Sequence, residues 1–379
     1  MNKKRILHFP LRNNRGGITK YILENWRYIN KDEFVFDFLT FEEQIDFKDE
    51  LLAEGCKIHY ISCTPRQDKE RFYSEVRNIL ENDYDAFHIH TSRWTGTEFE
   101  EIAMSCGIPN VIIHSHNTDI GISPEKTQQY NFFVERHERI KTEVSSNWKQ
   151  YATNLCACSD IAARWLFGNE LADTEVLTLK NAIDINRYVF NENARRKYKQ
   201  ELNLTDCFVI GHVGRFETQK NHRFIISMFS ELSRNLPSAR LLLIGNGPDF
   251  ENINTFAQEC GVINKIRLLS LRGDVPELMQ AMDVFILPSL HEGLPISLIE
   301  AQAAGLKCFV SDKVSTEAQI LHDTQYLPLD ELAWCSALID AENKAFSRND
   351  KSIEIDAAGF SINESVKVLE KLYRGEFRR

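Results

Sequence analysis

The feature that most constrains the fold is a repeated alternation between short apolar segments and helical patterns. The apolar segments are rich in branched and aromatic side chains, as expected of buried strands. They cover residues 5–9, 34–39, 57–61, 86–90, 111–115 and 155–158, and then 208–213, 241–244, 284–287 and 308–310. This alternation predicts an α/β fold with parallel, doubly wound sheets and right-handed crossovers. Ligands of such sheets bind beyond the carboxyl ends of the strands, so the loops that follow the strands are the candidate site.

The length of the chain predicts two domains. Its 379 residues exceed the size at which one hydrophobic core usually stops growing. We expect a first domain over residues 1–180 and a second over residues 181–350. Residues 351–379 should form a terminal segment whose helix carries an apolar face made of Ile362, Val366, Leu369 and Leu372.

Charge and cysteine content restrict the class of protein. The formal net charge of -10 argues against non-specific binding of nucleic acid. The nine cysteines form no CxxC pair, so free thiols in a reducing compartment are expected. We find no leader peptide and no window of transmembrane length, which predicts a cytoplasmic protein.

Residues 288–312 contain the most informative loop. They should form a loop, one helix and a short strand, with Pro295 in the first helical turn and Gly305 at the helix end. Glu292 lies in the loop and Glu300 in the helix. The first turn of a helix offers free N–H groups and a positive dipole end, and carboxylates accept hydrogen bonds from diols. The stretch therefore predicts a pocket for a polyhydroxylated, anionic ligand, with a plain turn and two solvated glutamates as the alternative.

The same stretch resembles retaining glycosyltransferases of family 4. The words S-L-H-E-G-L-P-I-S-L-I-E-A-Q-A-A-G-L contain the E-x7-E signature of that family as Glu292 and Glu300. The resemblance implies a GT-B fold, in which two Rossmann-like domains face an interdomain cleft and the C-terminal helix of residues 351–379 crosses back to pack on the first domain. It also implies that Glu300 holds the ribose diol of the donor and that Glu292 holds sugar hydroxyls. The N–H groups of Gly293 and Leu294 would support the sugar and the phosphate.

Two further loops of the second half carry cations. Arg215 and Lys220 follow the strand at 208–213, where they could stabilise negative charge on a leaving diphosphate, although basic pairs in loops are usually only surface residues. The run G-R-F-E-T-Q-K-N resembles the family's G-R-x-x-x-Q-K-N, which implies that both residues hold the donor diphosphate. By the same resemblance, Arg272 lies near the nucleotide base.

Gly16 and Gly17 follow the first strand and open a helix. A glycine pair allows close approach of the backbone to an anion at a helix N-terminus, although most such pairs simply form a turn. In the resembling family this loop faces the donor phosphates, which implies that role for Gly16 and Gly17.

Two H-x-H pairs lie at the ends of predicted strands: His88 and His90 in the run at 86–90, and His114 and His116 at the end of the run at 111–115. A strand places both histidines of a pair on one face, and histidine is the commonest metal ligand. No acidic or cysteine partner has ligand spacing beside them, so we predict no metal site. The resemblance implies that His116 forms a hydrogen bond with a donor sugar hydroxyl. His88, His90 and His114 are then packing residues or contacts of the acceptor.

The region after the second pair has two candidate contacts for the acceptor. Residues 117–127 read as an irregular loop that could act as a lid. The next helix carries Arg136, His137, Arg139 and Lys141, which form either a solvated face or a contact for an anionic acceptor such as a lipid phosphate.

The wording H-F-P…R-G-G-I-T-K-Y and H-S-H-N-T resembles bacterial capsule and exopolysaccharide transferases. The resemblance implies transfer of a hexose or N-acetylhexosamine from a UDP-linked donor to a hydroxyl of a glycan or lipid-linked oligosaccharide. It implies retention, no metal and no cofactor beyond the nucleotide sugar, and only a weak, peripheral association with the membrane. A nucleotide-sugar 2-epimerase of the same fold and a non-catalytic sugar-nucleotide-binding protein remain the alternatives.

Overall fold

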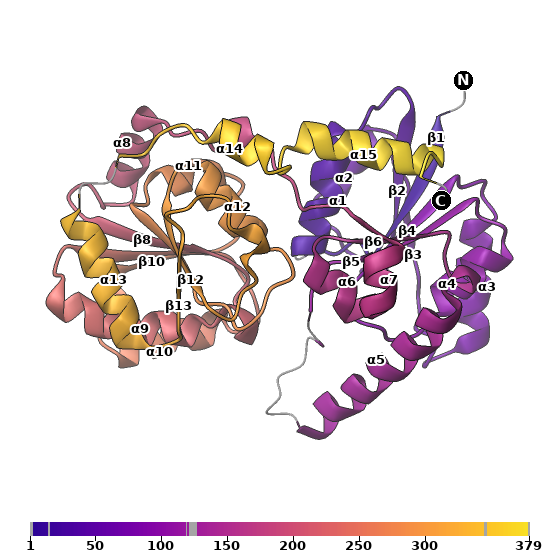
Figure 1. Cartoon of the computed structure of the whole chain (residues 1–379), viewed down its shortest axis with the longest axis horizontal. Helices are drawn as coiled ribbons and strands as arrows, with labels where there is room; N and C mark the ends of the chain where they lie inside the picture. Colours follow the sequence, from indigo (N-terminus) through magenta and orange to yellow (C-terminus); the bar gives the residue numbers. More distant parts are fainter. Residues whose placement is uncertain (1–2, 14–15, 119, 121–126, 345–346, 378–379) are drawn as a thin grey trace. The chain divides into compact units, whose positions relative to one another are not determined.

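A computed structural model of the chain describes residues 3–13, 16–118, 120, 127–344 and 347–377 (Figure 1). Its contacts divide the chain into two compact units. Unit 1 comprises Met1–Ala182 together with Ile362–Arg379, and unit 2 comprises Ile183–Ser361. The chain thus leaves unit 1 after Ala182 and returns to it at Ile362. No described helix combines the length and the apolar character needed to cross a membrane.

Unit 1 contains a sheet of seven parallel strands in the order β3-β2-β1-β4-β5-β6-β7. The order reverses between β1 and β4, so this is the switch point where ligands of open α/β sheets bind. The strands are β1 (Lys4–Phe9), β2 (Phe34–Thr40), β3 (Ile58–Tyr60), β4 (Ala86–Thr91), β5 (Asn110–Ser115), β6 (Asn154–Ala157) and β7 (Val176–Thr178).

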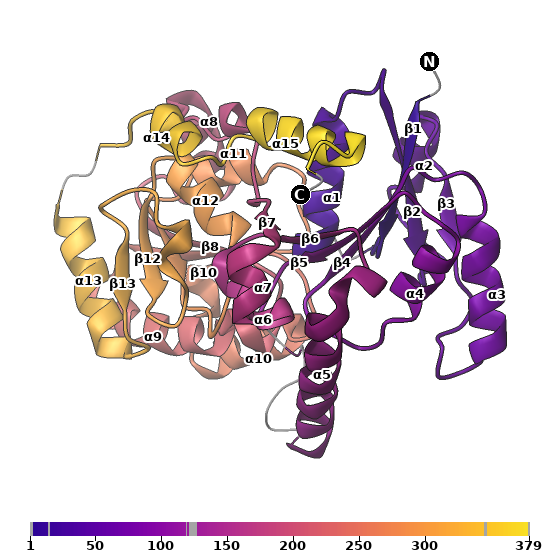
Figure 2. The same ribbon diagram turned by 45° about the vertical axis from the view of Figure 1, so that its right-hand side comes forward.

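Helices cover both faces of this sheet. They are α1 (Gly17–Tyr28), α2 (Lys48–Ala53), α3 (Lys69–Leu80), α4 (Glu98–Ser105), α5 (Thr127–Asn147), α6 (Asp160–Phe167), α7 (Asn169–Thr174) and α15 (Ile362–Arg374). On one face α15 lies beside α1, as both views show (Figures 1 and 2). The buried side of α15 contains the four apolar residues that the sequence places on one helical face, and they join the core formed with α1 and the sheet.

Unit 2 contains a sheet of six parallel strands in the order β10-β9-β8-β11-β12-β13. Its switch point lies between β8 and β11. The strands are β8 (Phe208–Val213), β9 (Ala239–Ile244), β10 (Ile266–Leu269), β11 (Val284–Leu287), β12 (Lys307–Ser311) and β13 (Gln325–Leu327). The helices are α8 (Glu192–Glu201), α9 (His222–Asn235), α10 (Phe250–Glu259), α11 (Val275–Gln280), α12 (Ile296–Ala303), α13 (Glu331–Asn343) and α14 (Ser352–Ala357).

Candidate functional site

The two loops at the switch point of unit 2 are held together by hydrogen bonds. Strands β8 and β11 pair directly and in parallel, so the loops at 214–221 and 288–295 leave the same edge of the sheet side by side. The backbone N–H of Leu290 donates to the carbonyl of Gln219 at 2.9 Å. The side-chain amide of Gln219 donates to the carbonyl of His291 at 2.8 Å. These bonds fix the position of one loop against the other.

An ion pair joins the same two loops. Lys220 Nζ lies 2.5 Å from Glu292 Oε1, and the side chains are only 14% and 8% exposed. The second carboxylate oxygen of Glu292 accepts a hydrogen bond from Gln219 Nε2 at 3.2 Å. Charges that are this far removed from water interact more strongly than surface pairs do. The structure therefore brings two of the predicted site residues into direct contact where ligands of this fold bind.

Arg215 lies in the same loop as Lys220 but is more accessible. Its guanidinium forms an ion pair with Glu217 at 3.1 Å, and its side chain is 39% exposed. A neighbouring turn packs tightly against the Arg215 loop, because a Cβ on Gly245 would lie 2.0 Å from the Gly214 carbonyl oxygen. Gly245 also has φ of +150°, so this glycine serves the packing of the turn.

Glu300 is buried in α12, with 1% of its surface exposed. The hydroxyl of Tyr188 donates a short hydrogen bond to Glu300 Oε1. Gly293 and Leu294 are buried in the loop just before α12, and Pro295 is its N-cap residue rather than part of its first turn. Tyr188 could not be identified from the sequence, because nothing in the local pattern shows which side chain reaches Glu300 across more than a hundred residues.

Arg272 lies apart from the Lys220–Glu292 pair. It follows β10, the edge strand, and β9 separates β10 from β8. Its guanidinium donates to both carboxylate oxygens of Asp274, at 2.7 and 2.6 Å, which lowers the pKa of Asp274 to about 2. Tyr198 also donates to Asp274, at 3.0 Å. The structure thus places Arg272 at the surface after the edge strand, in an ion pair with Asp274 that Tyr198 also contacts.

In unit 1, the predicted glycines lie at the switch point between β1 and β4. Gly16 is the N-cap residue of α1 and Gly17 is its first residue. Gly16 has φ of -62° and ψ of 176°, an extended conformation that any residue adopts. A Cβ on Gly17 would meet no described atom within 4 Å. The backbone of these residues therefore does not itself require glycine.

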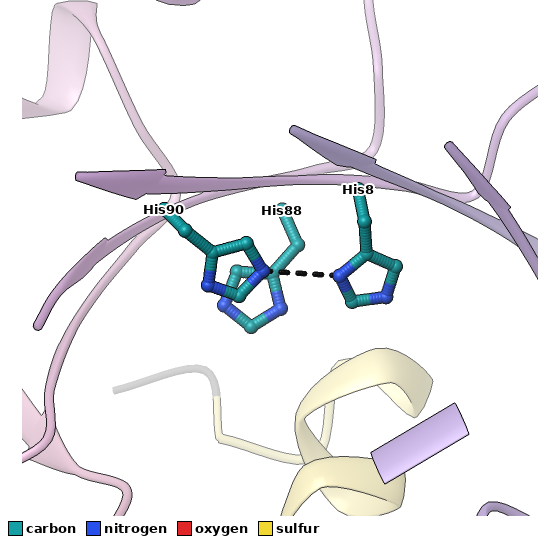
Figure 3. A group of neighbouring side chains, drawn as sticks. All are labelled: His8, His88 and His90. Carbon is teal, nitrogen blue, oxygen red and sulfur yellow. Dashed lines mark hydrogen bonds between the residues drawn. The ribbon is translucent and has the colours of Figure 1, made fainter. Parts of the chain in front are cut away.

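The two H-x-H pairs form one buried cluster with His8. In the register of the sheet, His8 pairs with His88 and His90 pairs with His114, so all five histidines point to the face covered by α1 and α15. Figure 3 shows three of them, His8, His88 and His90. Burial lowers the pKa of His8 and His116 to about 3 and that of the others well below the usual value. The cluster is therefore uncharged at neutral pH.

Neutral imidazoles are competent metal ligands. Within the described residues, His8, His88 and His90 form one group whose ring nitrogens lie within 4.8 Å of one another, and His90, His114 and His116 form a second. The two H-x-H pairs were recognisable in the sequence, but His8, which occupies the matching position on β1, was not predicted to join them. The sequence did contain a clue: His8, His88 and His114 occupy equivalent positions in their strands, so their side chains point to the same face of the sheet.

The basic face predicted for α5 needs one correction. His137 does not belong to it, because this residue is fully buried and its Nδ1 accepts a hydrogen bond from the Trp94 backbone N–H at 3.0 Å. Arg136 is half-buried, and its Nε donates to the Thr95 carbonyl at 2.7 Å. Within the predicted lid at 117–127, residues 119 and 121–126 lie outside the described residues.

Comparisons with known proteins agree with this architecture. The sequence profile of the family described as Glycosyl transferases group 1 matches residues 194–331. EpsF of Bacillus subtilis (strain 168), a glycosyltransferase by name, is 32% identical over 83% of this chain and 80% of its own length. An Escherichia coli relative named UDP-Gal:alpha-D-GlcNAc-diphosphoundecaprenol alpha-1,3-galactosyltransferase is 22% identical over 82% of this chain and 80% of its own.

The fold has a solved counterpart in Anabaena HepE, whose crystal structure was determined in complex with UDP. The two structures superpose with a TM-score of 0.74 at 16% identity, covering 99% of this chain and 100% of HepE. The two parallel-sheet, Rossmann-like units confirm the predicted GT-B class. On the strength of the EpsF match, which spans most of both chains, this protein belongs to the group 1 glycosyltransferases.

Proposed function

We propose that this chain is a retaining, metal-independent glycosyltransferase that takes a hexose or N-acetylhexosamine from a UDP-linked donor. The observation that carries the proposal is the Lys220–Glu292 pair, because it places a cation and a carboxylate together at the switch point of unit 2. A nucleotide sugar has both kinds of group that such a pair recognises, a diphosphate and a set of hydroxyls.

The cations of the β8–α9 loop act on the diphosphate. As the bond between the anomeric carbon and the phosphate oxygen breaks, negative charge accumulates on the leaving diphosphate. A cation that is already in place stabilises this charge most effectively. Lys220 supplies a point charge close to Glu292, and the more exposed Arg215 supplies a planar guanidinium that can bind two phosphate oxygens.

The carboxylates of the β11–α12 segment act on hydroxyls. Glu292 accepts hydrogen bonds from sugar hydroxyls near the reacting carbon, and Glu300 accepts them from the ribose diol. The N–H groups of Gly293 and Leu294 lie before the N-terminus of α12, whose dipole favours phosphate. Arg272 lies near the base, and the E. coli relative, which by its name uses UDP-Gal, supports uracil as that base.

Unit 1 supplies the remaining contacts of the proposal. Gly16 and Gly17 face the donor phosphates at the N-terminus of α1, and His116 forms a hydrogen bond with a sugar hydroxyl. The acceptor oxygen attacks the anomeric carbon on the face that the diphosphate leaves, and its proton passes to a diphosphate oxygen. This proton transfer needs neither a protein base nor a divalent metal, and the reaction needs no cofactor beyond the nucleotide sugar.

The acceptor is a hydroxyl of a glycan or a lipid-linked oligosaccharide in surface polysaccharide synthesis. The name of the E. coli relative states a diphosphoundecaprenol-linked acceptor. The N-terminal wording that resembles capsule and exopolysaccharide transferases points to the same class of acceptor. We place the enzyme in the cytoplasm, with weak, peripheral attachment to the membrane.

The test combines binding and turnover. Thermal-shift screening with UDP-, GDP- and ADP-linked sugars should show stabilisation by UDP sugars, growing with the logarithm of concentration. The best donor is then incubated with diphosphoundecaprenol-linked acceptors in the presence of EDTA. The proposal expects transfer with an α-linked product from an α-linked donor. An inverted product, or transfer abolished by EDTA, would refute retention or metal independence. Free epimerised nucleotide sugar formed without acceptor would instead identify a 2-epimerase.

A further inference from the structure

The five buried histidines of unit 1 form a continuous hydrogen-bonded chain with one tyrosine. Ring nitrogens face each other in three contacts: His114 Nδ1 with His88 Nε2 at 3.1 Å, His8 Nδ1 with His90 Nε2 at 3.0 Å, and His90 Nδ1 with His116 Nε2 at 2.9 Å. The hydroxyl of Tyr373, on α15, joins the two parts. It lies 2.8 Å from His88 Nδ1 and 3.4 Å from His8 Nε2.

The order of the chain is therefore His114, His88, Tyr373, His8, His90 and His116. Figure 3 shows its central histidines projecting from the strands toward α15. Four of the histidines are at most 2% exposed, whereas His116 is 9% exposed, so the more accessible end of the chain lies at His116, just past the carboxyl end of β5. This is the residue that the proposed function places beside the donor sugar. The other end, His114, lies on β5 itself, and the centroids of the His114 and His116 rings are 4.0 Å apart.

Each contact along the chain holds one proton. A neutral imidazole has one N–H and one lone pair, and a phenol donates one proton while it accepts another. Each histidine that donates on one side must therefore accept on the other. All contacts then donate in the same direction, either toward His116 or toward His114.

The inner end of the chain decides between the two directions. His114 Nε2 is buried, and within the described part of the chain it has no hydrogen-bond partner. A buried N–H without an acceptor is rarer in proteins than a buried acceptor that lacks a donor. A lone pair at Nε2 leaves the proton of His114 on Nδ1, from which it donates to His88. The rest of the chain then donates toward His116.

We infer that this chain has one polarity, which holds all five histidines as Nδ1–H tautomers and presents Nδ1 of His116 as a hydrogen-bond donor to an oxygen of the donor sugar. Tyr373 and His8 act through His90 and are positioning residues. The role toward the sugar rests on the proposed function, whereas the polarity itself does not. Because buried groups fix the polarity, the proton of His116 stays on Nδ1. An isolated histidine would instead exchange between its two tautomers.

A metal ion would require a different arrangement. Zinc binds imidazole nitrogen at about 2.0–2.1 Å through a lone pair. Both ring nitrogens of His8, His88 and His90 already face a partner in the chain, so a metal held by these three residues would displace contacts of the chain and disrupt it. The cluster can therefore either bind a metal or form a hydrogen-bonded chain of one polarity, and a single measurement can distinguish the two.

The test is long-range 1H–15N spectroscopy of the full chain labelled at histidine with 15N, without substrate and at neutral pH. The signals are assigned by single His→Asn variants. The inference expects a protonated Nδ1 and a bare Nε2 at all five histidines, unchanged by one equivalent of Zn²⁺. Nε2–H tautomers, mixed tautomers at His116, or stoichiometric Zn²⁺ uptake that displaces these signals would overturn it.

Two matched variants test the link through α15. Tyr373→Phe removes the hydroxyl that connects His88 to His8, so His8, His90 and His116 should then populate both tautomers. Tyr21→Phe is the control, because the Tyr21 ring packs against His90, His114 and His116 while its hydroxyl is not a member of the chain. Identical spectra for Tyr373→Phe and the wild type would overturn the role of Tyr373. These spectra are recorded without a nucleotide sugar, so they test the polarity independently of the proposed function. If the protein showed fixed tautomers but no transferase activity, the proposed function would be wrong and the polarity would still hold.

Discussion

Lys220 Nζ lies 2.5 Å from Glu292 Oε1, although 72 residues separate the two in the chain. Their loops meet because β8 and β11 are neighbours at the switch point of the sheet. Gln219 adds a hydrogen bond to the second carboxylate oxygen of Glu292. The topology of the sheet thus turns two distant sequence motifs into one small group of polar side chains.

A double-mutant cycle should show strong coupling between Lys220 and Glu292. Lys220→Met or Glu292→Gln alone leaves its partner poorly solvated and without its counter-charge, which costs about 3–5 kcal/mol when a buried pair is broken. The double variant should recover part of this loss. Urea unfolding of the four proteins measures the coupling, and additive effects of the two changes would show that the pair contributes no interaction energy.

Arg215→Ala should separate catalysis from stability. Loss of a donor that stabilises transition-state charge lowers kcat/KM by about 10²–10³. The Arg215 and Glu217 side chains are 39% and 32% exposed, so solvent screens their ion pair and the free energy of unfolding should change by less than about 1 kcal/mol. Glu217→Gln is the matched control, since it removes the same ion pair and keeps the guanidinium. Near-normal turnover of Arg215→Ala with the best donor would contradict its proposed role.

Tyr188→Phe should weaken donor binding through Glu300. The hydroxyl donates to a carboxylate that is 1% exposed, and a hydrogen bond to a charged group contributes about 1.5–3 kcal/mol. Loss of this bond removes one of the contacts that orient Glu300, so KM for the donor should rise more than kcat falls. Tyr151→Phe is the control, because it removes a comparable hydrogen bond to a carboxylate, Glu143 in unit 1, which has no part in the proposed donor site. Equal kinetic effects of the two variants would argue against a specific role for Tyr188.

The sheets and the switch-point loops could be predicted because their signals are local. Strand-like runs alternate with helices in both halves, and the motifs around Arg215, Lys220, Glu292 and Glu300 occur as nearly continuous words. The sequence motifs did not predict that Lys220 would form an ion pair with Glu292. The pairing depends on the strand order of unit 2, which no single segment specifies.

Hydrogen bonds between residues far apart in the sequence could not be predicted for the same reason. Tyr188 meets Glu300, and Tyr373 meets His88, only after helices and strands have packed. The burial of His137 is different, because its signal was present. It lies three and seven residues before Ile140 and Val144, the other buried residues of α5, and so belongs to the apolar stripe. The charged neighbours of His137 in the sequence concealed this spacing.

The last prediction concerns acid stability of unit 1. Burial lowers the pKa of His8 and His116 to about 3, against about 6.5 in an unfolded chain. Between these values the unfolded state binds protons that the folded state does not. The free energy of unfolding should therefore be unaffected above about pH 6.5 and should fall below it, by up to about 1.4 kcal/mol per pH unit for each such histidine.

The groups that face the histidines do not offset this loss. Tyr21 of α1, Tyr373 of α15 and Cys156 of β6 stay neutral over this range, since burial raises the pKa of each. Hydrogen exchange of the β4 and β5 amides at about pH 7.5, 6.5 and 5.5 measures the effect within unit 1. His8→Gln removes one titrating group, so its protection should decline less steeply on acidification than that of the wild type. Protection that stays constant down to about pH 5.5 would mean that the histidines gain protons without leaving the folded state, and that water or a counter-charge reaches the cluster.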